Sequence, residues 1–220
     1  MESTNVTKLR AAGAALAVAV LAGITAGCAP ASSPQPTSTS TSSASETPTP
    51  TPTPTMPAVD PADPSTWLIT DAGVGPILIG GDLTTTLAEL PDSWTNDAAA
   101  CAWSAFWQDP AANYQMYFVR GTESDTAPIG EISVNAGGHT EYGTGSPRTE
   151  DGLGLGSTRE EVLAAHADAQ EIPPQIGDTT WLMVPGTGEA HVFFGVREGD
   201  SAVSDVRVTT RSEPSYEVCG

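Results

Sequence analysis

Hydrophobic residues in the last 155 or so positions follow two different spacings, and each predicts a different element. Leu83, Leu87 and Leu90 are separated by four and then three residues, which places them on one face of a short helix. The hydrophobic residues within 192–196 instead alternate with their neighbours, and so do those within 203–209. Such alternation is typical of strands with one buried face. The pattern therefore predicts short helices that alternate with groups of strands.

The same series of elements occurs twice, at an offset of 74 to 77 residues. The matched segments are 73–91 with 149–167, 101–107 with 177–183, 114–120 with 191–197, and 129–136 with 203–210. The strands are joined by short polar turns rich in glycine, which favours antiparallel pairing. We therefore expect an α+β fold of two tandem repeats, residues 66–140 and 141–220. Each repeat is predicted to pack a short helix on a three- to four-stranded antiparallel sheet.

The N-terminal segment has the pattern of an export signal. Lys8 and Arg10 precede a short apolar run that ends at Gly27, directly before Cys28. The sequence "ITAGC" at residues 24–28 resembles a bacterial lipobox, in which the cysteine becomes the lipidated first residue of the mature chain. Residues 1–27 are accordingly predicted to be a lipoprotein signal peptide and Cys28 an acylation site. An ordinary secretory signal with an incidental cysteine is the alternative.

Residues 28–65 are dominated by Ser, Thr, Pro and Ala, including "TPTPTPTPT" at residues 47–55. Such a segment has too little apolar surface to offset the entropy of ordering, so we expect a disordered stalk. If Cys28 is acylated, Cys101 and Cys219 remain as an even pair outside the cytoplasm, where disulfides persist. We expect them to pair, with two free thiols as the alternative.

Composition argues against several classes of function. Without Lys8, Arg10 and Glu2 the chain keeps six Arg, no Lys and 26 acidic residues, a formal charge of −20. Such a surface repels nucleic acid. The "GLGLGST" segment at residues 152–158 lacks the lysine and the spacing of a phosphate-binding loop and is better explained as a tight turn. No catalytic motif or metal-ligand spacing occurs among the histidines, so we expect neither an enzyme nor a cofactor or metal.

Two segments carry a family resemblance: "GVGPILIGGDLTTTLAELP" at residues 73–91 and "RTEDGLGLGSTREEVLAAHADA" at residues 148–169. Tandem units that open in this way resemble the β-lactamase-inhibitor-protein-like fold, whose unit occurs singly in outer-membrane lipoproteins of the SmpA/OmlA type. The second segment is also similar to uncharacterised lipoproteins of high-GC Gram-positive bacteria. The resemblance implies a protein that binds or scaffolds rather than one that catalyses a reaction.

One sheet face is the candidate binding surface. If the side of Val192 and Phe194 is covered by helices, the repeat alignment assigns a set of aromatic, Met and Arg residues to the opposite, free face. These residues are Tyr114, Met116, Phe118, Arg120, His191, Phe193 and Arg197, with Trp103 and Trp107 on the neighbouring strand. Residues of these types are common in binding hot spots. The alternative is that they pack against the other repeat or against the segment around Trp67.

Together these observations predict a lipid-anchored binding or scaffold protein on the extracytoplasmic face of the cell membrane. Its partner would be a protein or a cell-wall-associated ligand, and the N-terminal lipid would be its only membrane contact. One alternative is an enzyme inhibitor that presents an acidic loop, with Asp109, Asp125 and Asp200 as candidates. A second alternative is an enzyme of unrecognised type.

Overall fold

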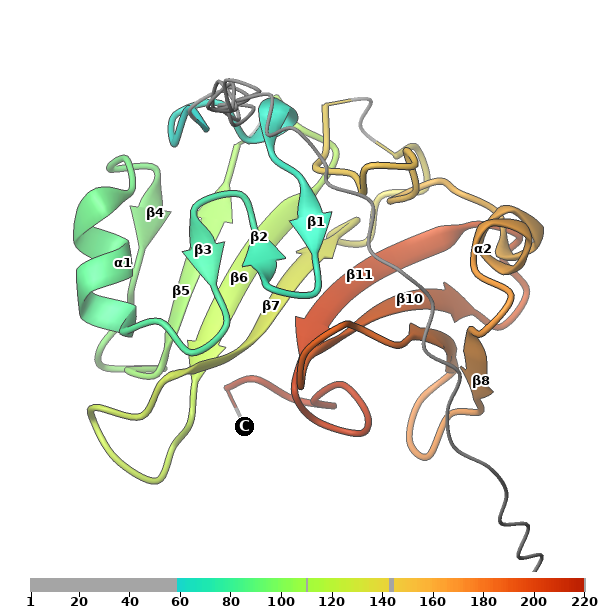
Figure 1. Cartoon of the computed structure of the whole chain (residues 1–220). Coiled ribbons are helices and arrows are strands. Elements are labelled where there is room, and N and C mark those ends of the chain that lie inside the picture. The colour runs from blue at the N-terminus through green and yellow to red at the C-terminus, as the bar shows by residue number, and fades with distance from the viewer. Residues whose placement is uncertain (1–58, 110, 143–144, 220) are drawn as a thin grey trace, which may run out of the picture. The chain divides into compact units, whose positions relative to one another are not determined.

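Antiparallel strands make up most of the regular secondary structure in the described chain, and two short α-helices accompany them (Figure 1). The computed structural model describes residues 59–109, 111–142 and 145–219. The predicted signal peptide, Cys28 and most of the predicted stalk lie outside these residues. No helix in the described ranges is long and apolar enough to cross a membrane.

The elements follow one another in a regular order. They are η1 (Pro64–Thr66), β1 (Ile69–Thr70), β2 (Gly73–Val74), β3 (Ile77–Leu78), α1 (Leu83–Glu89), β4 (Trp94–Thr95), β5 (Ser104–Gln108), β6 (Gln115–Arg120), β7 (Ile129–Asn135), α2 (Arg159–Ala165), β8 (Gln170–Ile172), β9 (Thr179–Val184), β10 (His191–Arg197) and β11 (Val203–Thr209). Each helix is thus followed by four strands. After the four strands that follow α1, a connection leads to α2.

The strands form two sheets. The larger sheet has eight antiparallel strands in the order β4-β5-β6-β7-β11-β10-β9-β8, and the smaller one has the order β1-β2-β3. The predicted mixed class with antiparallel sheets and few helices is confirmed. The division into sheets differs from the prediction, because β7 and β11 pair and join all eight strands instead of leaving a sheet for each helix.

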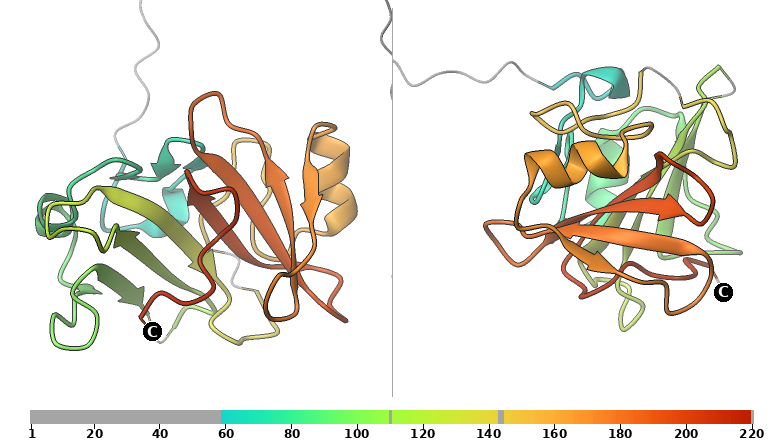
Figure 2. Two further views of the ribbon diagram at one scale, coloured as in Figure 1. Left: turned by 90° about the horizontal axis from the view of Figure 1, so that it is seen from below. Right: turned by 90° about the vertical axis from the view of Figure 1, so that its right-hand side faces the viewer.

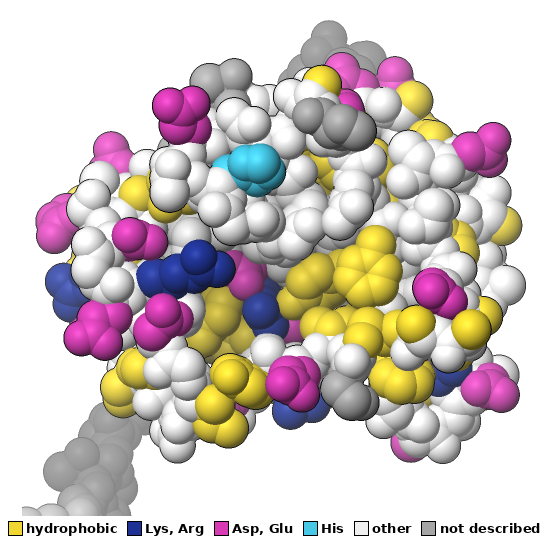
Figure 3. Space-filling model, turned by 180° about the vertical axis from the view of Figure 1, so that it is seen from behind, with side chains coloured by type: hydrophobic (Ala, Val, Ile, Leu, Met, Phe, Trp, Pro, Cys, Tyr) yellow, Lys and Arg dark blue, Asp and Glu magenta, His cyan; other side chains and the backbone are white. Residues whose placement is uncertain are grey.

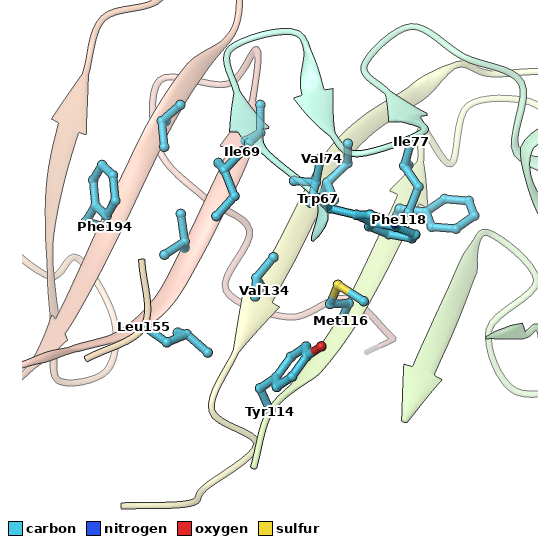
Figure 4. Close-up of a cluster of buried hydrophobic side chains, with 14 of the residues drawn as sticks. Trp67, Ile69, Val74, Ile77, Tyr114, Met116, Phe118, Val134, Leu155 and Phe194 are labelled. Carbon is cyan, nitrogen blue, oxygen red and sulfur yellow. The ribbon is translucent and has the colours of Figure 1, made fainter. Parts of the chain in front are cut away.

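The core lies on one side of the large sheet, which we call the inner face. The small sheet lies in front of this face and contributes Trp67, Ile69, Val74 and Ile77 from β1–β3 and the residues beside them (Figure 4). Trp67 stacks on Trp94 with ring centroids 6.2 Å apart. Because these side chains are almost completely buried, the small sheet and the large one share a single hydrophobic core.

The helices add smaller contributions to this core. Leu83 of α1 and Val162 of α2 are their buried residues. Helix α2 begins with a capping box, in which Thr158 accepts from the backbone N–H of Glu161 and the Glu161 side chain accepts from the N–H of Thr158. Gly156, with φ of +83°, makes the tight turn that leads into this helix, as expected for the "GLGLGST" segment.

The predicted free face of the sheet is wrong for β6. Phe118 lies opposite Ile132 of β7 and Ala105 of β5, and all three are buried in the core. Met116 and Tyr114 lie on this inner face as well (Figure 4). Trp107, which pairs with Met116, is buried in the same core. These four residues therefore share a face with Val192 and Phe194, not with Phe193, and they belong to the core.

Candidate binding site

The outer face of the large sheet, formed by the side chains that alternate with those of the core, carries aromatic and charged residues at its centre. Its central residues are Phe106, Tyr117, Glu131, Ser133, Trp181, Phe193, Asp205 and Arg207. Neither helix covers this side. Figure 3, which views the molecule from behind Figure 1, shows hydrophobic side chains next to basic and acidic ones in a hollow near the middle of this side.

Arg207 is the most strongly connected residue of the outer face. Its Nη1 lies 2.9 Å from Glu131 Oε1 on β7, and its Nη2 lies 2.9 Å from Asp205 Oδ2 on its own strand. Its guanidinium carbon lies 5.7 Å from the ring centre of Tyr117 and 5.1 Å from that of Trp181, which are cation–π distances. Burial lowers the pKa of Arg207, but the carboxylates of Asp205 and Glu131 raise it by more. The guanidinium is therefore permanently charged and held between two aromatic rings.

The final described segment, residues 210–219, runs along part of the outer face (Figure 2). Pro214 is buried, and Ser215 O accepts a hydrogen bond from Arg207. Ser215 also donates to Glu131 Oε2 from its backbone N–H at 2.9 Å and from its hydroxyl at 3.0 Å. The buried carboxylate of Glu131, 1% exposed, is thus satisfied by the segment and by Arg207 together.

A disulfide fixes the end of this segment to the connection between β4 and β5. Cys101 and Cys219 are joined, as the sequence predicted, across a separation of 118 residues. The indole N–H of Trp103 donates to the carbonyl oxygen of Val218 at 2.6 Å. Trp103 therefore helps to seat residues 210–219 and does not form part of an open surface.

A pocket of about 300 Å³ opens on the outer face beside this segment. Its floor and walls come from β6, β7, β9 and β11, and its rim from residues 176–178 and from Ser215 and Tyr216. Tyr216 and Ile176 are 62% and 63% exposed, although both are large hydrophobic residues. Gly177 brings the two sides of the rim together, since a Cβ built on it would lie 3.4 Å from the Tyr216 ring.

Tyr117 carries an unused hydrogen-bonding group next to this pocket. Its side chain is among the pocket's lining residues and is 8% exposed, and its hydroxyl is buried without a partner among the described residues. The nearby Ser133 hydroxyl already donates to Asp205 and accepts from Asn135. Burial, followed by the negative charge of Asp205, raises the pKa of Tyr117 far above its usual value, so the phenol stays protonated.

The structure separates the other predicted site residues. Phe193 lies on the outer face but is fully buried, with its ring centre 6.3 Å from that of Trp181. Arg197 is exposed and lines the pocket. His191 is half-buried at the far end of β10, where its Nδ1 accepts from Gly186 N. Arg120 turns into the β6–β7 connection, where it pairs with Asp125 at 3.0 Å. Of the nine predicted binding residues, only Arg197 contributes to the pocket.

The sequence analysis missed most residues of this pocket. Tyr117, Trp181, Asp205 and Arg207 each alternate with core residues of their own strands, and that alternation is visible in the sequence. They were not predicted as site residues because the sheet face on which they lie was not identified. That face depends on how the strands of the two halves are aligned.

His166 and the acidic residues near it lie outside the outer-face pocket. His166 is half-buried at the end of α2, with its Nε2 3.1 Å from Asp151 Oδ2. In the residues that the structure describes, no group of three or more His, Cys, Asp or Glu side chains is arranged to hold a metal ion.

Comparison with known proteins adds no relative. No protein-family model, no curated protein and no solved structure matches this chain.

Proposed function

We propose that this protein is a lipid-anchored extracytoplasmic binding protein and that the outer face of the large sheet is its ligand surface. The observation that carries the proposal is the pocket next to Tyr117, Trp181 and Arg207. In it, exposed hydrophobic rim residues surround polar groups, on the sheet face that no helix covers. Ligand sites typically combine such apolar walls with a few placed polar groups.

The anchor is the part of this proposal that rests on the sequence alone. The apolar run, Cys28 and the Ser/Thr/Pro-rich stalk suit a domain held at a distance from a membrane. Mass spectrometry of the mature N-terminus tests it directly. We expect an acylated Cys28 as the first residue, and an unmodified chain that begins beyond Cys28 would remove the anchor from the proposal.

We also infer that the folded part arose from two copies of one unit, consistent with the resemblance to β-lactamase-inhibitor-protein-like tandem repeats. On each side of the β7–β11 pair, the strands of the large sheet follow in the same order: the last strand after the helix is central, and the first is at the edge. The pairings of β6 with β7 and of β10 with β11 are each interrupted by a register shift, between Val119 and Arg120 and between Gly195 and Val196. Matching irregularities of this kind support duplication, because bulges are conserved features of a fold.

The turns before the two helices support the same inference. Gly80 N donates to Ile129 O at 2.8 Å, and Gly156 N donates to Val203 O at 2.9 Å. Both glycines have a positive φ, of +84° and +83°. In each half, the start of the helix is therefore bonded to the first residue of the last strand.

The ligand surface is tested with cell envelopes purified from the organism that makes the protein. Each protein carries Cys28→Ser, so that no acyl group contributes to the association. The protein with an intact pocket is then expected to sediment with the envelopes, and Trp181→Ala is expected to weaken this association. Leu78→Ala is a matched control, because Leu78 is a 53% exposed hydrophobic residue of β3 outside the pocket. Equal association of all three proteins would contradict the proposed surface.

A further inference from the structure

The rim of the outer-face pocket offers flat hydrophobic surfaces to a ligand. Trp181 is half-buried and is fixed by the edge-on contact with Phe193, whereas Tyr216 is mostly exposed. Aromatic faces of this kind bind flat apolar surfaces at low entropic cost, because their side chains have few rotatable bonds.

The charges around the pocket are balanced. Asp178 and Asp205 lie among its lining residues together with Arg197 and Arg207, so neither sign is in excess. Arg207 is already paired with two carboxylates, and the chain as a whole is strongly acidic, which disfavours an anionic ligand. A cationic ligand would compete with Arg207 for the faces of Tyr117 and Trp181. The pocket therefore favours an uncharged ligand.

Several polar groups at the pocket have hydrogen-bonding capacity to spare. Gln115 uses its Oε1 to accept from Gln108, which leaves its Nε2 without a partner among the described residues. The hydroxyl of Tyr117 is likewise without a partner among the described residues. The carboxylates of Asp178 and Asp205 add acceptors. A ligand that fits must both donate and accept hydrogen bonds.

The volume limits the ligand to one ring. Small-molecule pockets span about 300–1,000 Å³, and this pocket is at the lower end of that range. An extended peptide or a protein loop would need a longer groove.

We propose that this pocket binds a single uncharged sugar ring, as the terminal or branch residue of a glycan. The ring stacks its C–H face on the exposed ring of Tyr216, lies beside Trp181 and exchanges hydrogen bonds with Gln115 and Asp205. The Tyr117 hydroxyl is shielded from solvent in the free protein, so a sugar hydroxyl reaches it when the rim at Tyr216 shifts on binding. This inference rests on the proposed function, because it assigns a ligand class to the same surface.

The experiment uses the folded wild-type chain and ligand-observed NMR with a panel of methyl glycosides of glucose, mannose, galactose, arabinose and N-acetylglucosamine. Choline and inorganic phosphate serve as cationic and anionic probes of similar size. Trp181→Ala should weaken glycoside binding by about tenfold or more, and Tyr117→Phe should weaken it by a smaller factor. Tyr216→Ala provides a variant whose fold is not at risk, because its side chain is mostly exposed. Leu78→Ala should bind like the wild type.

The outcomes separate this inference from the proposed function. Glycoside binding that Trp181→Ala and Tyr216→Ala weaken supports both. If no glycoside binds, or if choline or phosphate binds in its place, the sugar assignment is overturned. The proposed function then stands only if envelope association still depends on Trp181. Glycoside binding that none of the pocket variants changes also overturns the assignment.

Discussion

Arg207 Nη1 lies 2.9 Å from Glu131 Oε1 across the junction of β11 and β7, where the two halves of the large sheet meet. Glu131 is 1% exposed, so its charge depends on this pairing and on the hydrogen bonds from Ser215. The Arg207–Glu131 pair therefore lies at the centre of the sheet, next to the outer-face pocket, and contacts residues 210–219.

Replacement of this arginine tests the energetic role of the pair. Arg207→Leu leaves the buried carboxylate of Glu131 unpaired and should lower the free energy of unfolding by about 3–5 kcal/mol at neutral pH. Urea unfolding at neutral pH measures this loss. A variant as stable as the wild type at neutral pH would show that solvent or other groups compensate for the arginine.

The disulfide should contribute strongly to stability because it closes a long loop. In the chain-entropy model, a loop of 118 residues corresponds to about 4–5 kcal/mol, so Cys101→Ser with Cys219→Ser should lower the unfolding free energy by about that amount. Denaturant unfolding of the wild type with and without reductant gives an independent measurement. Equal stability of the oxidised and reduced proteins would contradict this role.

A substitution of Phe118 tests whether this residue belongs to the core or to an exposed contact surface. It is fully buried in the core, so Phe118→Ala should lower the free energy of unfolding by about 3–5 kcal/mol. Thermal or chemical denaturation measures the loss, and Leu78→Ala should change stability by no more than about 0.5 kcal/mol. Unchanged stability of the Phe118 variant would contradict its place in the core and support the exposed position that the repeat alignment predicted.

For a substitution of Tyr117 we expect no loss of stability. Its buried hydroxyl has no partner among the described residues, and a buried unsatisfied polar group costs about 1–3 kcal/mol. Tyr117→Phe removes only that hydroxyl and should leave the free protein equally stable or more stable by denaturant unfolding. A clear loss of stability would mean that the hydroxyl has a bonding partner in the free protein.

The sequence predicted the elements well because they depend on the local sequence. The helix around Leu83, the tight turn in residues 152–158 and the alternation in residues 203–209 all appear where they were expected. The disulfide between Cys101 and Cys219 was predicted from the cysteine count, which is independent of the details of the fold.

The free face was predicted wrongly for β6 because the two halves were aligned with an error of one residue. Matching residues 114–120 with 191–197 placed Phe118 over Gly195, whereas the paired strands and their register shifts place it over Phe194. In a strand, a slip of one residue exchanges the two faces. The matching V-R pairs at the ends of these segments concealed the slip, and only strand pairing over the whole sheet could reveal it.

Backbone NMR of the folded protein, titrated with soluble fragments of the cell wall, shows whether the outer face binds a ligand. We expect chemical-shift changes grouped on β6, β9, β11 and residues 215–216. Changes grouped on α1 and the small sheet, or none at all, would rule out the outer face as the ligand surface.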